Sequence, residues 1–434
     1  MVRVIADLHI HSKYSRATSR NVDVEHIARF AAIKGLKVVG TGDFTHPLWL
    51  RELKASLEEE GDTGLYRPLR PSNSPVLFMM TAEVCTAFRS DVDGKAHRIH
   101  HVILAPSMEA AEQINDVLSP LGDLSADGRP TLAASPAELV ERVLEVCPEA
   151  EVIPAHVWTP WFSLFGAFSG FDSVEDCYED MAHHIHALET GLSSDPPMNW
   201  RVSSLDRFVL VSNSDSHSPY PWRMGREANV FDFKPGELSY RAIVGAIRRR
   251  DAKRLKMTVE VNPAYGKYHW TGHRKCGVSL PSEEAIKLGN RCPICGRELT
   301  KGVEQRVEEL ADRPYGFRPE GAVDYVHLLP LSEIIMKAIG ASSPNARDVW
   351  RVYEQLVARF GNEYSVLLDA GEEDLRAVAG PLVAEAVVRV REGRVKIVPG
   401  YDGVYGEVLL FEGGAPRPMR PRGGQLSLLD FMGA

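Results

Sequence analysis

Over residues 1 to about 235, short apolar runs alternate with helical patterns, and this alternation limits the possible fold more than any other feature. Most runs are almost continuously apolar, as in parallel strands that are covered on both faces. One helical pattern begins at Asp23 and stops at Gly35, and another begins at Ser135. The alternation predicts an α/β domain, either a parallel barrel or a doubly wound sheet. The seven predicted strands are VRVIADL, LKVVGTG, PVLFMMTAEV, RIHHVILA, AEVIPAHVW, IHALETG and FVLVSNSD.

Side chains of the kinds that bind metal ions lie at or just past the ends of these runs. His9 and His11 are two residues apart at the end of a strand, so both imidazoles face the same side, and Asp215 and His217 repeat this spacing. Active sites of parallel α/β barrels form at the C-terminal ends of the strands. We therefore expect one shared rim, and its predicted ligands are His9, His11, Asp43, Glu83, His101, His156, Asp215 and His217.

These ligand types point to hydrolysis at phosphorus. Imidazoles and carboxylates without a thiolate suit Zn²⁺, Mn²⁺ or Fe²⁺, and we expect Zn²⁺ here, with Mg²⁺ or Mn²⁺ as the alternative. Two or three ions acidify a water molecule and hold the phosphoryl oxygens, so no side-chain nucleophile is needed. We expect Glu83 to bridge ions, and Glu83, Asp215 and His217 to be the catalytic side chains. His100 and His101 are neighbours; alternation allows only one to face the site, and His101 is preferred.

A second cluster has the spacing of a structural zinc site. His273 and Cys276 are followed after fifteen residues by Cys292 and Cys295 in CPICG, which is typical of a closed Cys3His site. His269 is the alternative fourth ligand, and redox chemistry is the minor alternative for the CxxC motif.

The segment around this cluster is basic although the whole chain carries a net charge of −9. Residues 239–301 contain 14 Lys or Arg and 5 Asp or Glu, a local balance of +9. Aromatic and basic side chains mixed in this way favour nucleic-acid binding, although core aromatics beneath a zinc knuckle would give the same pattern. The candidates for DNA contact in this segment are Tyr265, Lys267, Tyr268, Arg274 and Lys275.

The aromatic stretch WTPWFSLFGAFSGF directly follows His156. We expect it to form part of a pocket or wedge for a base, with Trp158, Trp161 and Phe165 in contact with DNA. The alternative is a hydrophobic lid that packs on the barrel.

The predicted domains are 1–235 (catalytic barrel), 236–311 (basic zinc-binding domain), 312–412 (mostly helical) and 413–434 (disordered tail). In the helical domain, Gly380 lies in a turn that faintly resembles a helix-hairpin-helix.

The tail ends in QLSLLDFM, which fits the box that docks on PCNA-type sliding clamps. Its anchor residues are Gln425, Leu428, Phe431 and Met432.

The N-terminal motifs resemble those of the PHP (polymerase and histidinol phosphatase) superfamily: HxH, an Asp-containing turn, a Glu, two further His and a final DxH. The resemblance implies a distorted (β/α)7 barrel. One metal ion would take His9, His11, Glu83 and Asp215; a second would take Glu83, His101 and His156; a third would take Asp43 or His46 with His217. The second motif, GTGDFTHP, departs from the superfamily pattern because Asp43 and His46 are not adjacent.

With NPAYGKYHWTGHRKCG, NRCPICG and PGYDGVYGE, the chain from about residue 3 to 412 resembles the endonuclease Q family. This implies nicking on the 5′ side of deaminated bases (uracil, hypoxanthine, xanthine) or abasic sites in double- or single-stranded DNA, leaving 3′-hydroxyl and 5′-phosphate ends. A base read within a duplex must be flipped out of the stack.

The alternatives are a PHP phosphatase or exonuclease acting on other phosphoesters, and an inactive clamp-bound scaffold. No apolar run suits a membrane span, so we expect a cytoplasmic, nucleoid-associated protein.

Overall fold

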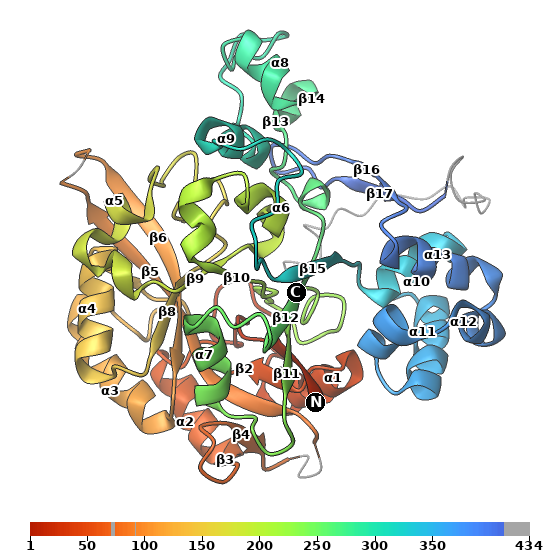
Figure 1. Ribbon diagram of the computed structural model, residues 1–434, viewed down its shortest axis with the longest axis horizontal. Helices are drawn as coiled ribbons and strands as arrows, with labels where there is room; N and C mark the ends of the chain where they lie inside the picture. The colour runs from red at the N-terminus through yellow and green to blue at the C-terminus, as the bar shows by residue number, and fades with distance from the viewer. Residues whose placement is uncertain (71–73, 92, 412–434) are drawn as a thin grey trace.

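The computed structural model describes residues 1–70, 74–91 and 93–411 (Figure 1). The strands are β1 (Val2–Asp7), β2 (Val38–Gly40), β3 (Leu57–Glu59), β4 (Tyr66–Pro68), β5 (Leu77–Arg89), β6 (Ala96–Ala105), β7 (Thr131–Leu132), β8 (Glu151–Pro154), β9 (Ala187–Glu189), β10 (Val209–Val211), β11 (Ala228–Phe233), β12 (Leu255–Glu260), β13 (Thr271–His273), β14 (Val278–Leu280), β15 (Asp324–His327), β16 (Lys396–Val398) and β17 (Glu407–Leu409). The helices are α1 (Val24–Lys34), α2 (Pro47–Ser56), α3 (Met108–Leu118), α4 (Pro136–Val146), α5 (Val174–Tyr178), α6 (Pro196–Asn199), α7 (Tyr240–Arg248), α8 (Ser282–Lys287), α9 (Val303–Leu310), α10 (Leu331–Ile339), α11 (Arg347–Phe360), α12 (Glu372–Ala379) and α13 (Pro381–Arg391).

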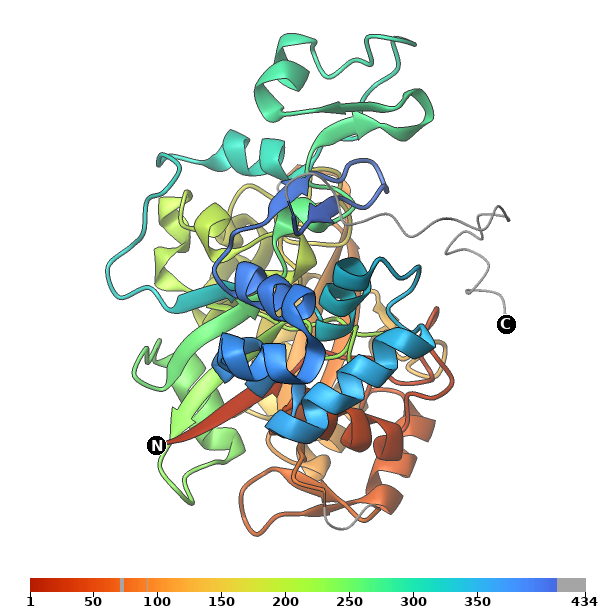
Figure 2. The same ribbon diagram turned by 90° about the vertical axis from the view of Figure 1, so that its right-hand side faces the viewer.

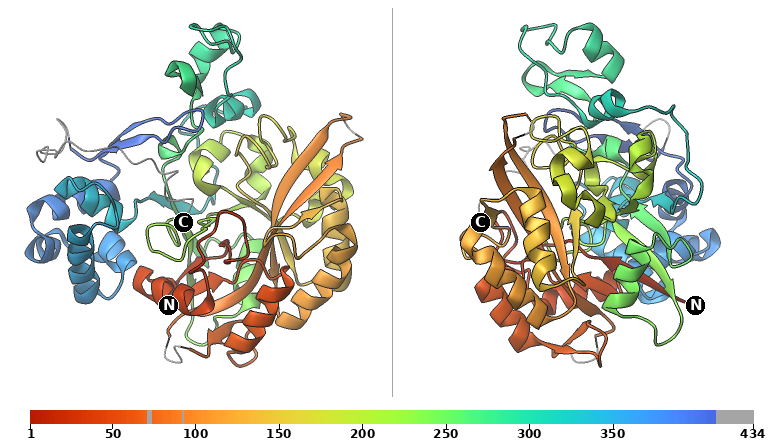
Figure 3. Two further views of the ribbon diagram at one scale, coloured as in Figure 1. Left: turned by 180° about the vertical axis from the view of Figure 1, so that it is seen from behind. Right: turned by 60° about the vertical axis from the view of Figure 1, so that its left-hand side comes forward.

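One large mixed sheet organises the N-terminal part of the molecule. Its strand order is β15-β12-β11-β1-β2-β5-β4-β3, while β6 and β7 pair with β5, and β8 pairs with β6. The strands β9 and β10 form a separate parallel pair. The helices α3 and α4 lie along the outer side of β5, β6 and β8 (Figures 1 and 3).

All seven predicted strands are present, but the expectation of a purely parallel sheet is wrong. β1, β2 and β5 are parallel neighbours, whereas β6 runs antiparallel to both β5 and β8. β5 and β6 form a hairpin whose last pair is Arg89 with Ala96, and so short a connection permits only antiparallel pairing. The His pair of β6 therefore lies in the middle of a strand.

The two predicted helix starts are confirmed by their caps. The Asp23 carboxylate accepts a hydrogen bond from the N–H of His26, and Ser135 Oγ accepts one from the N–H of Glu138. The first helix ends at Gly35, whose φ of 98° lies in the left-handed region. These caps fix where α1 and α4 begin.

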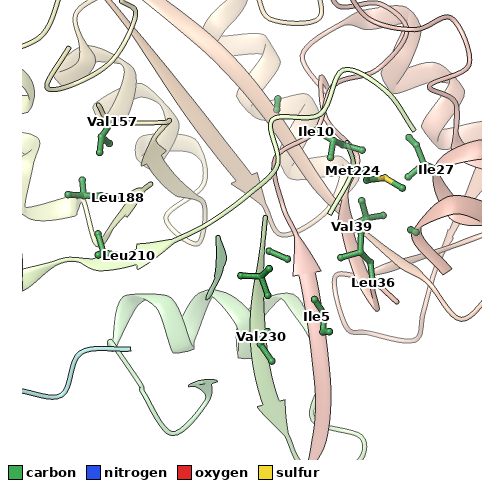
Figure 4. Packing of buried hydrophobic residues seen from close by; sticks show 14 of the residues in the cluster. Ile5, Ile10, Ile27, Leu36, Val39, Val157, Leu188, Leu210, Met224 and Val230 are labelled. Carbon is green, nitrogen blue, oxygen red and sulfur yellow. The ribbon is translucent and has the colours of Figure 1, made fainter. Parts of the chain in front are cut away.

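A continuous apolar core joins the sheet to its helices. Ile5 of β1 is paired with Val230 of β11. Val39 of β2 and Ile27 of α1 belong to the same buried cluster (Figure 4). Ile5, Val39 and Ile27 are each 5% exposed or less. The buried strands hold the rim of the sheet in a fixed position.

The sheet extends past the predicted boundary at residue 235. β12 pairs with β11, and β15 pairs in parallel with β12. Residues 255–260 and 324–327 therefore belong to the same sheet as β1, and the segment with the cysteine cluster is an insertion between β12 and β15. In Figure 1 this insertion, with β13, β14 and α8, projects away from the sheet.

The C-terminal part is a helical bundle followed by a hairpin. α10 packs against α11 and α13 in this bundle (Figure 2). α12 and α13 meet at Gly380, whose φ is 81°. The hairpin β16–β17 returns to the insertion, where the Gly400 N–H donates to Ala264 O (2.9 Å). A Cβ at Gly400 would lie 2.1 Å from Gly266 O, so only glycine permits this approach. The predicted clamp-binding residues Gln425, Leu428, Phe431 and Met432 lie outside the described residues.

Candidate metal centre

The segment after β1 runs beside the segment after β10. Ile10 and Ser216 form a parallel bridge, and the His11 N–H donates to Ser216 O (2.9 Å). The Leu8 N–H donates to Asn213 Oδ1 (2.8 Å). Residues about 200 positions apart in the chain therefore present their side chains at the same rim.

His9, His11, Glu83 and Asp215 form the first group of potential ligands, and their ligand atoms all lie within 4.8 Å of one another. His11 Nε2 is 3.1 Å from both Glu83 Oε2 and Asp215 Oδ1, and His9 Nε2 is 3.5 Å from Glu83 Oε2. His9, His11 and Glu83 are buried, whereas the Asp215 side chain is 30% exposed. Asp215 therefore lies at the mouth of the group, where a substrate can approach.

Glu83, His100 and His156 form the second group. Glu83 Oε1 is 2.9 Å from His100 Nδ1 and 3.2 Å from His156 Nε2. The preference for His101 was wrong, because alternation along β6 turns His101 to the other side. There, His101 Nδ1 lies 2.8 Å from Tyr178 Oη, and its Nε2 lies 3.0 Å from Thr86 Oγ1.

Glu83 is shared by the two groups, one carboxylate oxygen to each. Oε2 faces His9 and His11, and Oε1 faces His100 and His156. The Arg129 guanidinium donates to Oε2 (3.0 Å). Burial opposes the charge on this carboxylate, but Arg129 and the imidazoles hold the pKa of Glu83 well below its usual range. Glu83 is therefore ionised and placed to bridge two cations.

Asp43, His46 and His217 do not form a third group among the described residues. Asp43 Oδ2 accepts hydrogen bonds from Ser12 N and Ser12 Oγ (2.6 Å each) and from Ser15 Oγ (2.9 Å), and Asp43 Oδ1 lies 3.0 Å from His11 Nδ1. Asp43 therefore orients His11, and the prediction that Asp43 binds a metal ion is corrected.

His46 and His217 also lack a shared ligand geometry. The His46 ring stacks on Tyr14 with centroids 4.4 Å apart, and its Nδ1 is buried without a hydrogen-bond partner. His217 Nδ1 lies 3.7 Å from Asp215 Oδ1, and its ring lies 4.3 Å from that of His11. His217 thus borders the first group, whereas His46 packs at the start of α2.

The residues fit divalent cations by chemistry as well as by spacing. His9 Nε2 is buried, points into the first group and has no hydrogen-bond partner. Burial lowers the pKa of His100 to about 4, so this imidazole is neutral near pH 7, as a metal ligand must be. For His9, burial opposes protonation, but Glu189 and Glu83 raise its pKa well above the usual value. In the first group, protons and cations therefore compete for the imidazole.

Backbone strain coincides with this centre. Asp43, His156 and Asp215 have φ values of 50°, 33° and 46°, in the left-handed region that non-glycine residues rarely adopt. Strain of this kind persists where the surrounding structure fixes it, often at functional sites.

Two residues of the centre were missed from the sequence. Glu189 ends β9, and its carboxylate accepts hydrogen bonds from the His156 N–H (2.9 Å) and Asn213 Nδ2 (2.8 Å) and lies 3.0 Å from His9 Nδ1. Its place at the end of the predicted strand IHALETG was a usable signal. Arg129 lies in a loop that no motif marks, so no comparable signal existed.

The cysteine cluster is assembled as its spacing suggested. His273, Cys276, Cys292 and Cys295 have their ligand atoms within 4.8 Å of one another. Burial opposes ionisation of Cys292, but the backbone N–H groups of Cys295 and Ile294 lower its pKa to about 6. His269 is outside this group, and the set suits a tetrahedral zinc ion.

The aromatic loop is divided between core and surface. Trp158 and Phe165 are 0% and 1% exposed, and their tilted rings pack against each other with centroids 4.7 Å apart, so the prediction that they contact a base is wrong. Trp161 is 39% exposed and meets Tyr268 edge-on at 5.4 Å. Tyr265 donates from its hydroxyl to Glu333 (3.0 Å), whereas Lys267, Arg274 and Lys275 are exposed.

Every helix among the described residues is too short or too polar to cross a bilayer.

Parts of the chain match a known family model and a known relative. Residues 330–394 match the family model described as the MJ0043 C-terminal domain. The uncharacterized protein MJ0043 of Methanocaldococcus jannaschii is 35% identical over 254 residues, which are 58% of this chain and 31% of that protein. The chain thus matches about a third of this relative.

Two solved structures match over nearly the full length. The novel lesion-specific endonuclease PfuEndoQ from Pyrococcus furiosus has a TM-score of 0.83 and 32% identity, covering 94% of this chain and 95% of that one. Endonuclease Q complexed with a 27-mer duplex substrate with an abasic lesion at the active site has a TM-score of 0.82 and 33% identity, covering 94% and 96%. The expected PHP-type α/β fold is confirmed, and the chain belongs to the endonuclease Q family.

Proposed function

We propose that this endonuclease repairs DNA by hydrolysing the phosphodiester on the 5′ side of deaminated bases or abasic sites, leaving 3′-hydroxyl and 5′-phosphate ends. The observation that carries the proposal is the Glu83 carboxylate, whose two oxygens each face a different group of ligands. A related endonuclease Q of similar structure holds duplex DNA with an abasic lesion at its active site.

The two groups would hold Zn²⁺, Mn²⁺ or Mg²⁺, and such ions would activate water and neutralise charge on the phosphate. His9, His11 and Asp215 would bind one ion, His100 and His156 the other, and Glu83 both. The Arg129 guanidinium is 30% exposed beside Glu83, so it can also contact a phosphate oxygen. A third ion with ligands from His217 would need substrate or water to complete its shell.

The DNA would lie over the rim and the exposed face of the insertion. Lys267, Arg274 and Lys275 would neutralise phosphates, and Trp161 with Tyr268 would offer aromatic faces to unpaired bases. A deaminated base is mispaired with the base opposite it, so flipping it out of the duplex costs less than flipping a correctly paired base. This difference would favour uracil, hypoxanthine and xanthine over undamaged bases.

Incision of end-labelled duplexes tests the proposal. With Mg²⁺, Mn²⁺ or Zn²⁺, we expect a single nick in strands that contain uracil, hypoxanthine or an abasic site, and none in the undamaged strand. Glu83→Gln should lower the rate at least 100-fold, because it removes the charge shared by two cations. The exposed Glu175→Gln serves as the matched control and should retain wild-type activity.

The alternatives give different results in the same assay. Turnover of p-nitrophenyl phosphate without nicking would favour a phosphatase. DNA binding without either reaction would favour an inactive scaffold.

We also propose that the tail binds a PCNA-type sliding clamp through Gln425, Leu428, Phe431 and Met432. The support is the sequence of the box alone. A chain truncated after Gly424 should lose retention on immobilised clamp but keep its nicking rate. Equal retention of the truncated and full-length chains would refute clamp binding by the box.

A further inference from the structure

An open groove lies between the β5–β6 hairpin and the loop that follows His156. Its volume is about 420 Å³, within the range of pockets that bind small organic groups. Apolar side chains form most of its surface, with two arginines in its lining. The residues that matter here are Phe88, Arg98, Trp161, Phe162 and Ser169.

Phe162 connects this groove to the second ligand group. Its ring stacks on the His100 imidazole with centroids 5.1 Å apart and an interplanar angle of 18°. The ring is nevertheless 39% exposed, so it still offers surface to the groove. A planar group that stacks on Phe162 from the groove would therefore be one ring away from a ligand of the metal centre.

The backbone holds Phe162 in a strained conformation. Its φ is 61°, which is unfavourable for a bulky side chain. Its N–H donates to Ser169 Oγ (2.7 Å), and its carbonyl accepts from the His100 N–H (2.9 Å). Strained residues cluster at functional sites, so this exposed ring beside the second ligand group is a candidate contact for a ligand.

The groove offers stacking and charge but few groups that could read a base edge. The two ring nitrogens of His97 are engaged with Ser169 O (2.9 Å) and Asp93 Oδ1 (3.0 Å). Ser169 Oγ is engaged with the Phe162 N–H. Arg98 is exposed and forms no ion pair within the described parts of the chain. Aromatic faces beside a cation suit any nucleotide, irrespective of its base.

We propose that this groove is a sequence-independent subsite for an undamaged nucleotide next to the cut. The base stacks on Phe162, and Arg98 neutralises a phosphate of the same strand. This inference rests on the proposed endonuclease function and adds a nucleotide contact that is separate from recognition of the lesion.

Phe162→Ala tests the stacking contact. Under single-turnover conditions we expect about 10-fold slower nicking for both the uracil and the abasic duplex, because one base–aromatic stack is lost in each case. Phe162→Tyr, which keeps the ring, should remain near the wild-type rate, and all variants should keep their metal content. Phe317→Ala, which removes an aromatic ring of similar exposure (37%), should have no effect.

The two substrates make the result decisive. A Phe162→Ala enzyme that is slow on uracil but normal on the abasic duplex would overturn the proposal, since the ring would then contact the damaged base itself. Normal nicking of both duplexes would overturn it as well.

A binding assay separates this inference from the proposed function. The probe is a duplex with 2-aminopurine beside an abasic site and a methylphosphonate linkage at the expected cut. We expect the wild-type protein to quench its fluorescence and Phe162→Ala to lose that quenching. If the wild-type protein nicks no damaged duplex, the proposed function fails, whereas quenching that depends on Phe162 would still support the groove.

Arg98→Ala tests the phosphate contact. The slope of log affinity against log salt concentration should become smaller by about 1, and Arg98→Lys should restore it. An unchanged slope in Arg98→Ala would overturn this part of the proposal.

Discussion

Glu189 shows how a residue outside the ligand groups can control them. Its carboxylate lies 3.0 Å from His9 Nδ1, which fixes this nitrogen as the hydrogen-bond donor and leaves Nε2 for a cation. The same carboxylate also accepts a hydrogen bond from the backbone N–H of His156, which holds the backbone of this second-group residue in place. Glu189 is therefore a positioning residue for both groups.

We expect Glu189→Gln to weaken metal binding about 10- to 100-fold, because the amide orients His9 less strongly. Nicking should fall at limiting metal and recover at high metal concentration. Titration of activity against metal concentration measures this shift, with the exposed Glu112→Gln as control. A lower rate that excess metal does not restore would argue against a positioning role.

We expect Glu260 to make the stability of the protein depend on pH. Burial, and after it the carboxylate of Asp195, raise the pKa of Glu260 to about 8 from an ordinary value of 4.5. Between these values the unfolded chain releases a proton that the folded protein retains, so the free energy of unfolding falls as the pH rises. With about 1.4 kcal/mol per pKa unit, the loss amounts to a few kcal/mol.

Glu260→Gln should reduce this loss, because the amide cannot ionise. Urea unfolding at pH 5 and pH 8 should show a smaller difference for the variant than for the wild type. The exposed Glu320→Gln should leave the difference unchanged. A variant with the full wild-type pH dependence would show that other groups cause it.

At the scale of elements, the hairpin β13–β14 and the helix α8 have too small a core to fold without help. Their buried cluster contains only Val278, Ala285, Cys292 and Leu299 within the described chain. A core of this size stabilises little, so a bound zinc ion would supply most of the folding free energy.

Cys292→Ser should therefore release one zinc ion per chain and expose residues 271–300 to limited proteolysis. Cys85→Ser, which changes a buried thiol in β5, should keep the zinc. Metal analysis and mass spectrometry of the fragments measure both effects. Retention of zinc and of protease resistance by Cys292→Ser would contradict the assignment.

At the scale of the whole molecule, a buried ion pair joins the sheet domain to the helical bundle. Lys34 Nζ of α1 donates to Glu363 Oε1 (2.6 Å), and both side chains are at most 1% exposed. Glu363 also accepts from the Tyr353 hydroxyl (2.7 Å) and the Leu331 N–H (2.9 Å). The bundle therefore docks through a fully bonded carboxylate.

Lys34→Ala should lower the free energy of unfolding by about 3–5 kcal/mol, because it leaves Glu363 buried without its cation. Arg3 and Asp369 join the same two parts through a pair that is 49% exposed on each side. Arg3→Ala should cost less than about 1 kcal/mol, since solvent screens this pair. Chemical unfolding of both variants measures the contrast, and equal losses would refute it.

The sequence by itself determined seven of the strands, the starts of α1 and α4, and most of the residue types at the rim. Apolar runs, caps and the HxH and DxH spacings are local, so His9, His11, Glu83 and Asp215 could be named without coordinates. The spacing of the four zinc-type ligands is local in the same way.

The tertiary structure decided how these residues are used. Whether His100 or His101 faces the centre depends on the orientation of β6 relative to β5, and the burial of Trp158 and Phe165 depends on what covers their loop. Asp43 orients His11 because the serines after His11 fold onto its carboxylate. Each of these outcomes depends on contacts between residues distant in the chain, and no local pattern encodes such contacts.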